Sequence, residues 1–159
     1  MNAARRAILE DIVKLYHKST PKENISTIIE SHYDEQSQFK DPFFDVTGRE
    51  KVKTQFVAMY EYFDTYQLNN VKFDEVSDEQ VNIVAEGEYV IKGKNIKLDQ
   101  ETRIYFNSSN KVTFHNDHFR GTVFESMETT PVIKQLFTGW RKATGLVGDQ
   151  ILSRTVSKE

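Results

Sequence analysis

Residues 33–48 read YDEQSQFKDPFFDVTG, and this stretch decides the fold. Because side chains alternate between the two faces of a strand, Phe39 and Asp41 are expected on one face of a short strand. Pro42 cannot donate a hydrogen bond to a sheet, and Gly48 permits the turn after which the chain restarts as a helix. The stretch therefore predicts a strand that ends on a carboxylate set among aromatic side chains.

Three amphipathic helices are expected around this strand. Apolar residues at helical spacing mark residues 3–17 and 49–66 as helices. A further helix is expected between these two. Thr20, as its N-cap, and Pro21, at its first helical position, mark its start, and it ends near His32. The first 66 residues are therefore predicted as three helices and one short strand.

From Asn70 onward, apolar residues recur at every second position, which is the period of a strand. Four strands are expected, at residues 71–76, 81–91, 96–106 and 111–120. The links between the last strands have the length of hairpins, so the pattern predicts an antiparallel sheet without a parallel βαβ crossover. Gly87, in the middle of a strand, predicts a bulge or a sharp bend.

Composition limits the class of protein. The 159 residues suit one domain, with 38% hydrophobic and 12% aromatic residues for its core. A net charge of −3 argues against a nucleic-acid binder, and the lack of cysteine excludes disulfides and thiolate chemistry. No apolar run reaches the roughly 20 residues of a membrane span. A cytoplasmic protein without membrane insertion is expected.

The order of elements resembles the nuclear transport factor 2-like superfamily, which includes ketosteroid isomerases and SnoaL-like polyketide cyclases. The resemblance covers about residues 3–122 and rests most on FKDPFFDVTG at 39–48 and HNDHF at 115–119. It implies an α+β fold, in which helices wrap a curved antiparallel sheet into a cone with a pocket in its mouth. Residues 1–125 are then the cone, and residues 126–159 are a C-terminal helix and tail packed on the same domain.

The resemblance also implies a general base. In ketosteroid isomerases an aspartate followed by proline and then by glycine has this role, and Asp41 matches it, with Pro42 and Gly48. Thr102 stands where those enzymes carry a protonated acid. Burial among aromatic rings raises the pKa of a carboxyl group, as a base near neutral pH requires. The alternative is an Asp-Pro turn in which the carboxylate accepts nearby N–H groups.

Two further polar sets are candidates for the cone mouth. Gln100 and Thr102 interrupt an apolar strand face, so they either face a pocket or hydrogen-bond to neighbouring strands. In the last strand, alternation from an inward Val112 points Asn116 and His118 into the pocket. His115 and Asp117 are then expected on the other face. A bulge would reverse this orientation.

The predicted function is binding of an apolar small molecule, with proton transfer (isomerase, dehydratase or cyclase) as the enzyme class. Asp41 is the predicted base, and His118 or Asn116 polarises the substrate. The predicted ligand-binding residues are Tyr33, Phe39, Phe56, Tyr60, Gln100, Thr102, Asn116 and Trp140. No metal site and no cofactor are predicted, because alternate strand faces chelate poorly. The alternative is a non-catalytic binding or dimerisation module of the transport-factor type, and a homodimer stays open.

Residues 126–152 extend beyond the cone and are predicted as a fourth helix. Thr130 and Pro131 repeat the start signal of a helix, and Trp140 belongs to its apolar face. An apolar helix face that includes a tryptophan is too large to remain exposed to water, so it must pack against another surface. The alternatives are the mouth of the cone, a dimer interface and a membrane surface, and a cover on the protein's own cone is the prediction.

Overall fold

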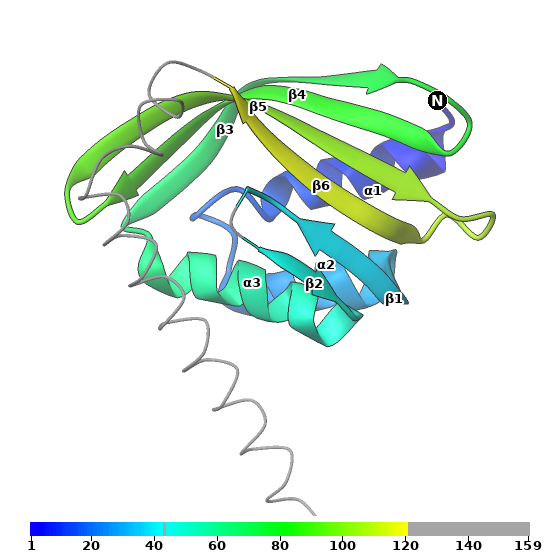
Figure 1. The fold of residues 1–159 in the computed structure, drawn as a ribbon, viewed down its shortest axis with the longest axis horizontal. Coiled ribbons are helices and arrows are strands. Elements are labelled where there is room, and N and C mark those ends of the chain that lie inside the picture. The colour runs from blue at the N-terminus through cyan, green and yellow to red at the C-terminus, as the bar shows by residue number, and fades with distance from the viewer. Residues whose placement is uncertain (43, 121–159) are drawn as a thin grey trace, which may run out of the picture.

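The computed structural model describes residues 1–42 and 44–120, which form three helices and one six-stranded sheet (Figure 1). The helices are α1 (Ala3–Lys14), α2 (Lys22–His32) and α3 (Arg49–Tyr62). The strands are β1 (Tyr33–Lys40), β2 (Asp45–Thr47), β3 (Thr65–Glu75), β4 (Gln80–Ile91), β5 (Lys94–Phe106) and β6 (Val112–Arg120). The predicted helix at 126–152, its Trp140 and the domain boundary after residue 125 lie outside the described residues.

The strands follow the order β2-β1-β6-β5-β4-β3 in one curved, open sheet. All neighbouring pairs are antiparallel except β1 and β6, which run parallel. The predicted α+β class and curved antiparallel sheet are confirmed. The parallel pair was not predicted, because it joins the first strand to the last, whereas the hairpin links concern only consecutive strands.

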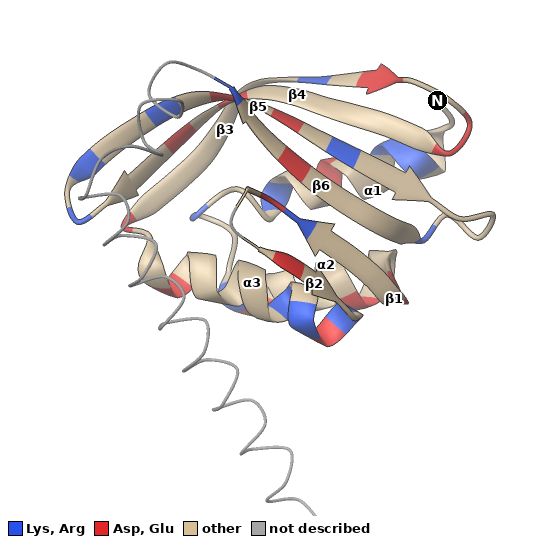
Figure 2. Ribbon diagram, viewed as in Figure 1, with Lys and Arg blue, Asp and Glu red and all other residues tan. Residues whose placement is uncertain are grey.

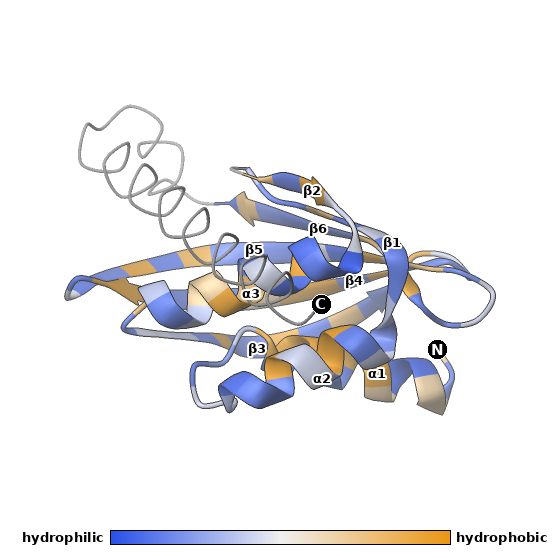
Figure 3. Cartoon of the chain, turned by 90° about the horizontal axis from the view of Figure 1, so that it is seen from below, coloured by the Kyte–Doolittle hydropathy of each residue, from blue (hydrophilic) through white to orange (hydrophobic). Residues whose placement is uncertain are grey.

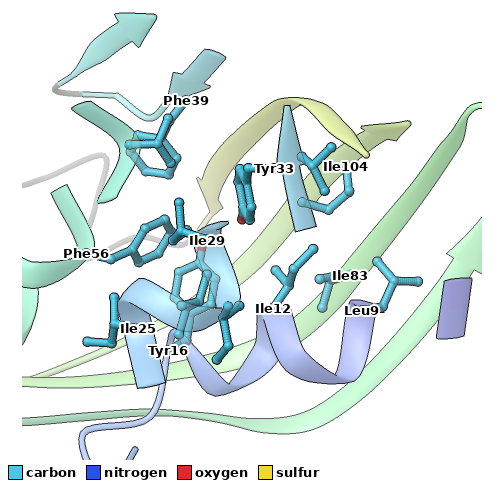
Figure 4. Close-up of a cluster of buried hydrophobic side chains, with 14 of the residues drawn as sticks. Leu9, Ile12, Tyr16, Ile25, Ile29, Tyr33, Phe39, Phe56, Ile83 and Ile104 are labelled. Carbon is cyan, nitrogen blue, oxygen red and sulfur yellow. The ribbon is translucent and has the colours of Figure 1, made fainter. Parts of the chain in front are cut away.

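The three helices lie on one side of the sheet, which arches over them (Figures 1 and 3). Each helix carries hydrophobic residues on the face that packs against its neighbours, as their buried residues show. A continuous apolar core fills the space between helices and sheet (Figure 4). Among the described residues, no helix is long and apolar enough to cross a bilayer.

Thr20 has a different role from the predicted N-cap. α1 ends at Lys14, and the Thr20 hydroxyl donates a hydrogen bond of 2.7 Å to the Lys14 carbonyl oxygen. Pro21 is the N-cap of α2, without a side-chain hydrogen bond. The hydroxyl therefore satisfies a free carbonyl at the end of α1 and leaves the start of α2 uncapped.

The chain leaves the helical conformation earlier than predicted after α3. The helix ends at Tyr62, and β3 already begins at Thr65, where the prediction placed the strand at 71–76. Tyr66 and Leu68 are both buried in β3, at the spacing of a strand. A pair of aromatic residues three apart, Phe63 and Tyr66, fits a helical stripe as well, so periodicity alone misplaced this boundary.

Candidate functional site

The last strand turns the opposite face inward from the one predicted. Its pairing with β5 shifts by one residue just after Val112, and a bulge of one residue exchanges the two faces beyond it. His115 and Asp117 are buried, whereas Asn116 and His118 face outward and are only partly covered. The predicted inward orientation of Asn116 and His118 is therefore wrong.

Asp117 is a buried acceptor at the centre of the cone. Its Oδ2 accepts a hydrogen bond of 2.6 Å from the Tyr16 hydroxyl, and its Oδ1 accepts one of 2.5 Å from the Thr102 hydroxyl. Only 4% of Asp117 is exposed. Asp117 Oδ1 also lies 3.3 Å from His115 Nε2, and among the described residues no lysine or arginine forms an ion pair with it. A carboxyl group without a cation, held this deep, is unusual in a part of the fold that serves packing alone.

The imidazole of His115 bridges two tyrosines beside this carboxyl group. Tyr16 Oη lies 2.6 Å from His115 Nε2, and Tyr33 Oη lies 2.7 Å from His115 Nδ1. Because the Tyr16 proton is directed at Asp117, Nε2–H donates to Tyr16, and Nδ1 accepts from Tyr33. Burial and the negative charge of Asp117 raise the pKa of Tyr16 and of Tyr33 well above the ordinary value, so both remain donors.

A second arm of hydrogen bonds leads from Asp117 along the inner face of the sheet. The Gln100 amide donates to Thr102 Oγ1 at 3.0 Å, and the Tyr89 hydroxyl donates to Gln100 Oε1. Thr102 lies directly opposite Asp117 in the register of β5 and β6. The predicted alternative for Gln100 and Thr102, hydrogen bonds to neighbouring side chains, is confirmed. We call the connected residues the Asp117 network: Tyr16, Tyr33, Tyr89, Gln100, Thr102, His115 and Asp117.

Tyr89 ends the Asp117 network and is surrounded by apolar side chains on its other sides. Its ring centroid lies 5.7 Å from that of Phe63 and 6.5 Å from that of Phe119. Ile96 is its register partner in β5, and Leu98 lies two residues further along the same face. These four side chains are half-buried, unlike the closed core deeper in the cone. We call Tyr89 and its four apolar neighbours the Tyr89 site.

Gly87 makes room for the Tyr89 ring. A Cβ at this position would lie 2.7 Å from Tyr89 Cε2 and 3.2 Å from Leu98 Cδ1. The pairing of β4 with β5 is regular at Gly87, so the predicted bulge is not there. The irregularity occurs instead in β3, next to Asn70, whose φ is 54°. Gly87 is therefore needed because the Tyr89 ring lies close to the backbone at this position. It does not change the register of β4 and β5.

Asp41 follows directly after β1 and is half-buried. Its Oδ1 accepts a hydrogen bond of 2.6 Å from the Phe44 N–H, and its own N–H donates to the Phe44 carbonyl at 2.9 Å. This is the geometry of the turn alternative. The Asp41 charge also contributes to the raised pKa of Tyr89, after burial and the charges of Asp117 and Tyr66.

The predicted aromatic ligand contacts lie mostly in the closed core. Tyr33, Phe39 and Phe56 are buried, and Figure 4 shows them around the same interior region as Tyr16. The Phe39 and Phe56 ring centroids lie 5.1 and 5.6 Å from that of His115, so these rings enclose the imidazole. Tyr60 is half-buried on α3.

The outer face of the sheet holds His118 and a polar groove. Burial and the neighbouring Arg103 guanidinium lower the pKa of His118, whose register partner is Glu101. A groove of about 310 Å³ is lined by Asn70, Lys72, Val84, Ala85, Glu86, Asp99, Gln100, Glu101 and Arg120. Because charged side chains dominate this lining, the groove differs from the predicted apolar pocket.

Four members of the Asp117 network were absent from the predicted site: Tyr16, Tyr89, His115 and Asp117. Tyr16 and Tyr89 fell on apolar faces of their elements, where a tyrosine ordinarily fills the core. His115 and Asp117 were recognised as polar residues of the last strand and were assigned to its other face. Only the bulge beyond Val112 separates the two assignments, and no residue at that place marks it.

No protein-family model matches the sequence, and no curated protein matches it. Among solved structures, a steroid Δ-isomerase from Pseudomonas aeruginosa is similar, with a TM-score of 0.62 and 12% identity over 96% of this chain and 97% of the other. A SnoaL-like protein from Agrobacterium tumefaciens has a TM-score of 0.61 and 11% identity, covering 74% of this chain and 97% of its own.

A nuclear transport factor 2-like protein of unknown function from an Exiguobacterium species is similar as well. Its TM-score is 0.62 with 15% identity, and the match covers 72% of this chain and 99% of the other. At such low identity the likeness concerns the arrangement of helices and strands and leaves activity open. The curved sheet, the three helices beneath it and these likenesses agree with the predicted superfamily: the chain has the nuclear transport factor 2-like fold.

Proposed function

We propose that the protein binds an apolar small molecule at the Tyr89 site and transfers a proton on it, with Asp41 as the general base. The observation that carries the proposal is the two-sided environment of Tyr89. On one side its hydroxyl joins the buried Asp117 network, and on the other its ring lies among half-buried apolar side chains. The charge of Asp41 adds to the raised pKa of Tyr89. Apolar walls with a few fixed polar groups are the usual composition of a small-molecule site.

The Asp117 network supplies a fixed set of polar groups on one side of the Tyr89 site. Each of its hydroxyl protons and one amide proton of Gln100 have an acceptor, so the side chains are held in one arrangement. Preorganised dipoles of this kind stabilise charge that develops during proton transfer, because they need no rearrangement. His118 has no part in the proposal, because it lies on the opposite face of the sheet.

The outer sheet face favours ligand binding over the dimerisation alternative. Outward residues of β3, β4 and β5 are mainly polar or charged, and Figure 2 shows both signs of charge across the sheet. They include Gln67, Asn69, Lys72, Asp74, Asn82, Glu86, Glu88, Lys97, Asp99, Glu101 and Arg103. The stable homodimers that this alternative requires have more apolar interfaces.

A model proton-transfer reaction tests the proposal without knowledge of the substrate. In 5-nitrobenzisoxazole a base removes the ring C–H proton, the N–O bond breaks, and a coloured cyanophenolate is released. We expect a rate that saturates with substrate concentration, because the apolar ring binds at the Tyr89 site. Asp41→Asn should lower kcat about 100-fold or more, the range of a general base. The measurement is steady-state absorbance of the phenolate.

The matched control is Asp74→Asn, which changes an exposed aspartate on the outer face of β3. It should leave kcat and KM unchanged. A rate that never saturates, or an equal rate in Asp41→Asn and the parent protein, would refute the proposal. Circular dichroism of both variants checks that the fold is intact.

A further inference from the structure

The Tyr66 hydroxyl is a buried polar group for which residues 1–42 and 44–120 supply no hydrogen-bond partner. Tyr66 lies in β3 directly opposite Tyr89 in β4, and both side chains are on the inner face of the sheet. The Phe63 ring contacts both, with centroids 6.1 Å from Tyr66 and 5.7 Å from Tyr89. Tyr66 is 1% exposed, so its hydroxyl has given up water without gaining a partner from the described part of the chain.

Such a hydroxyl is costly to the folded protein, since buried polar groups almost always find a partner. Phenylalanine would fill the same space without this cost. Within the Asp117 network the buried hydroxyl groups are paired, although Ser37 Oγ in β1 is, like the Tyr66 hydroxyl, without a hydrogen-bond partner among the described residues. A polar atom placed here without a partner is what a binding site for a polar ligand atom presents before the ligand arrives.

The neighbouring Tyr89 hydroxyl offers the complementary role. Its single proton is donated to Gln100 Oε1, so toward any further group its oxygen can only accept. Tyr66 has its proton to donate. A group that accepts from Tyr66 and donates to Tyr89 is a hydroxyl group, whereas a carbonyl oxygen would use Tyr66 alone.

We propose that Tyr66 and Tyr89 together bind the hydroxyl group of an apolar ligand. The inference rests on the proposed function, because it places the polar end of the ligand at the Tyr89 site. It defines the ligand class as an apolar molecule, such as an aromatic or alicyclic ring, that carries an alcohol, phenol or enol.

Electrostatics is consistent with a pair of neutral phenols. Burial raises the pKa of Tyr66, and the neighbouring Tyr60 adds to the effect. Burial also raises the pKa of Tyr89, with contributions from Asp117, Tyr66 and Asp41 that outweigh the opposite effect of Gln100. Both groups therefore keep their protons at neutral pH, so the donor and acceptor roles above hold there.

Matched probes separate the hydroxyl group from the apolar body. 2-Naphthol and 2-methylnaphthalene have similar size, and only the first carries a hydroxyl group. Calorimetric titration of the full chain should give about tenfold tighter binding of 2-naphthol, the value of one well-formed hydrogen bond. Tyr66→Phe should abolish this preference and leave the affinity for 2-methylnaphthalene unchanged. Tyr105→Phe, on the outer face, is the control and should keep the preference.

Thermal unfolding of the ligand-free variant supplies an independent result. Tyr66→Phe should keep or raise the melting temperature, because it removes an unpaired buried hydroxyl. A lower melting temperature would mean that the hydroxyl is already paired, for example with a fixed water, and would overturn the inference. Equal binding of both probes, unchanged in Tyr66→Phe, would overturn it while the apolar site stands. Failure of both probes to bind would reject this inference and the proposed function together.

Discussion

At position 87 the sheet has room for no side chain larger than a hydrogen atom. Gly87 lies beneath the Tyr89 ring, and the position of a Cβ there is 2.7 Å from Tyr89 Cε2 and 3.4 Å from Gln100 Oε1. A ring carbon cannot yield as the end of a flexible chain does, so any Cβ displaces Tyr89 from its hydrogen bond to Gln100. The hydrogen bond that joins Tyr89 to the rest of the Asp117 network therefore depends on the absence of a side chain at Gly87.

Gly87→Ala should therefore lower the free energy of unfolding by about 1–3 kcal/mol, the usual cost of overpacking. Urea unfolding measures it. The same substitution in a Tyr89→Ala background should cost much less, because the clashing ring is gone. An equal cost in both backgrounds would assign the effect to the strand itself and contradict the role given to Tyr89.

At the scale of the elements, one buried polar side-chain pair strengthens the ladder between β5 and β6. Thr102 and Asp117 are register partners, and their side chains share a hydrogen bond of 2.5 Å in the buried interior. We expect Thr102→Val and Asp117→Asn each to cost about 1–3 kcal/mol of unfolding free energy, because each leaves a buried group unpaired. A double-mutant cycle should show clear coupling between them, and additive costs would exclude a direct interaction.

Local pattern predicted the elements well and their orientation less well. The period of two marked β4 and β5 correctly, and helical spacing, with Pro21 as a start signal for α2, located all three described helices. The orientation of β6 failed because a single extra residue inverts a strand, and the free energy of a bulge depends on its partner strand. No local sequence pattern predicts the pairing of β1 with β6, because the two strands are far apart in the chain. The polar site was missed for a similar reason, since Tyr16 and Asp117 are 101 positions apart in the chain and the bulge in β6 turns Asp117 inward.

At the scale of the whole molecule, buried tyrosines tie stability to alkaline pH. The pKa values of Tyr16, Tyr33 and Tyr89 lie well above 10.0 in the folded protein. Below pH 10.0 all three are protonated in both states, and their contribution to stability is complete. Above it the unfolded chain loses protons that the folded protein keeps, so the free energy of unfolding falls as the pH rises.

Each of these tyrosines adds a slope of about 1.4 kcal/mol per pH unit in that range. Denaturant unfolding at a series of alkaline pH values measures the total, and ultraviolet absorbance should show part of the phenolate signal only on unfolding. Tyr66, whose pKa burial also raises, adds a fourth such group, so Tyr89→Phe should reduce the slope by about a quarter. A stability that stays flat through this range would contradict the burial of the phenols.

The parallel pairing of β1 with β6 has a consequence for how the chain is made. The hydrogen bond from Tyr33 to His115 spans 82 positions, and that from Tyr16 to Asp117 spans 101. On the ribosome, at roughly 5–20 residues per second, the partner strand emerges about 4–16 s after β1. During that interval β1 has only the short strand β2 beside it, and its other edge, with the aromatic residues that later contact β6, has no partner strand until β6 is made.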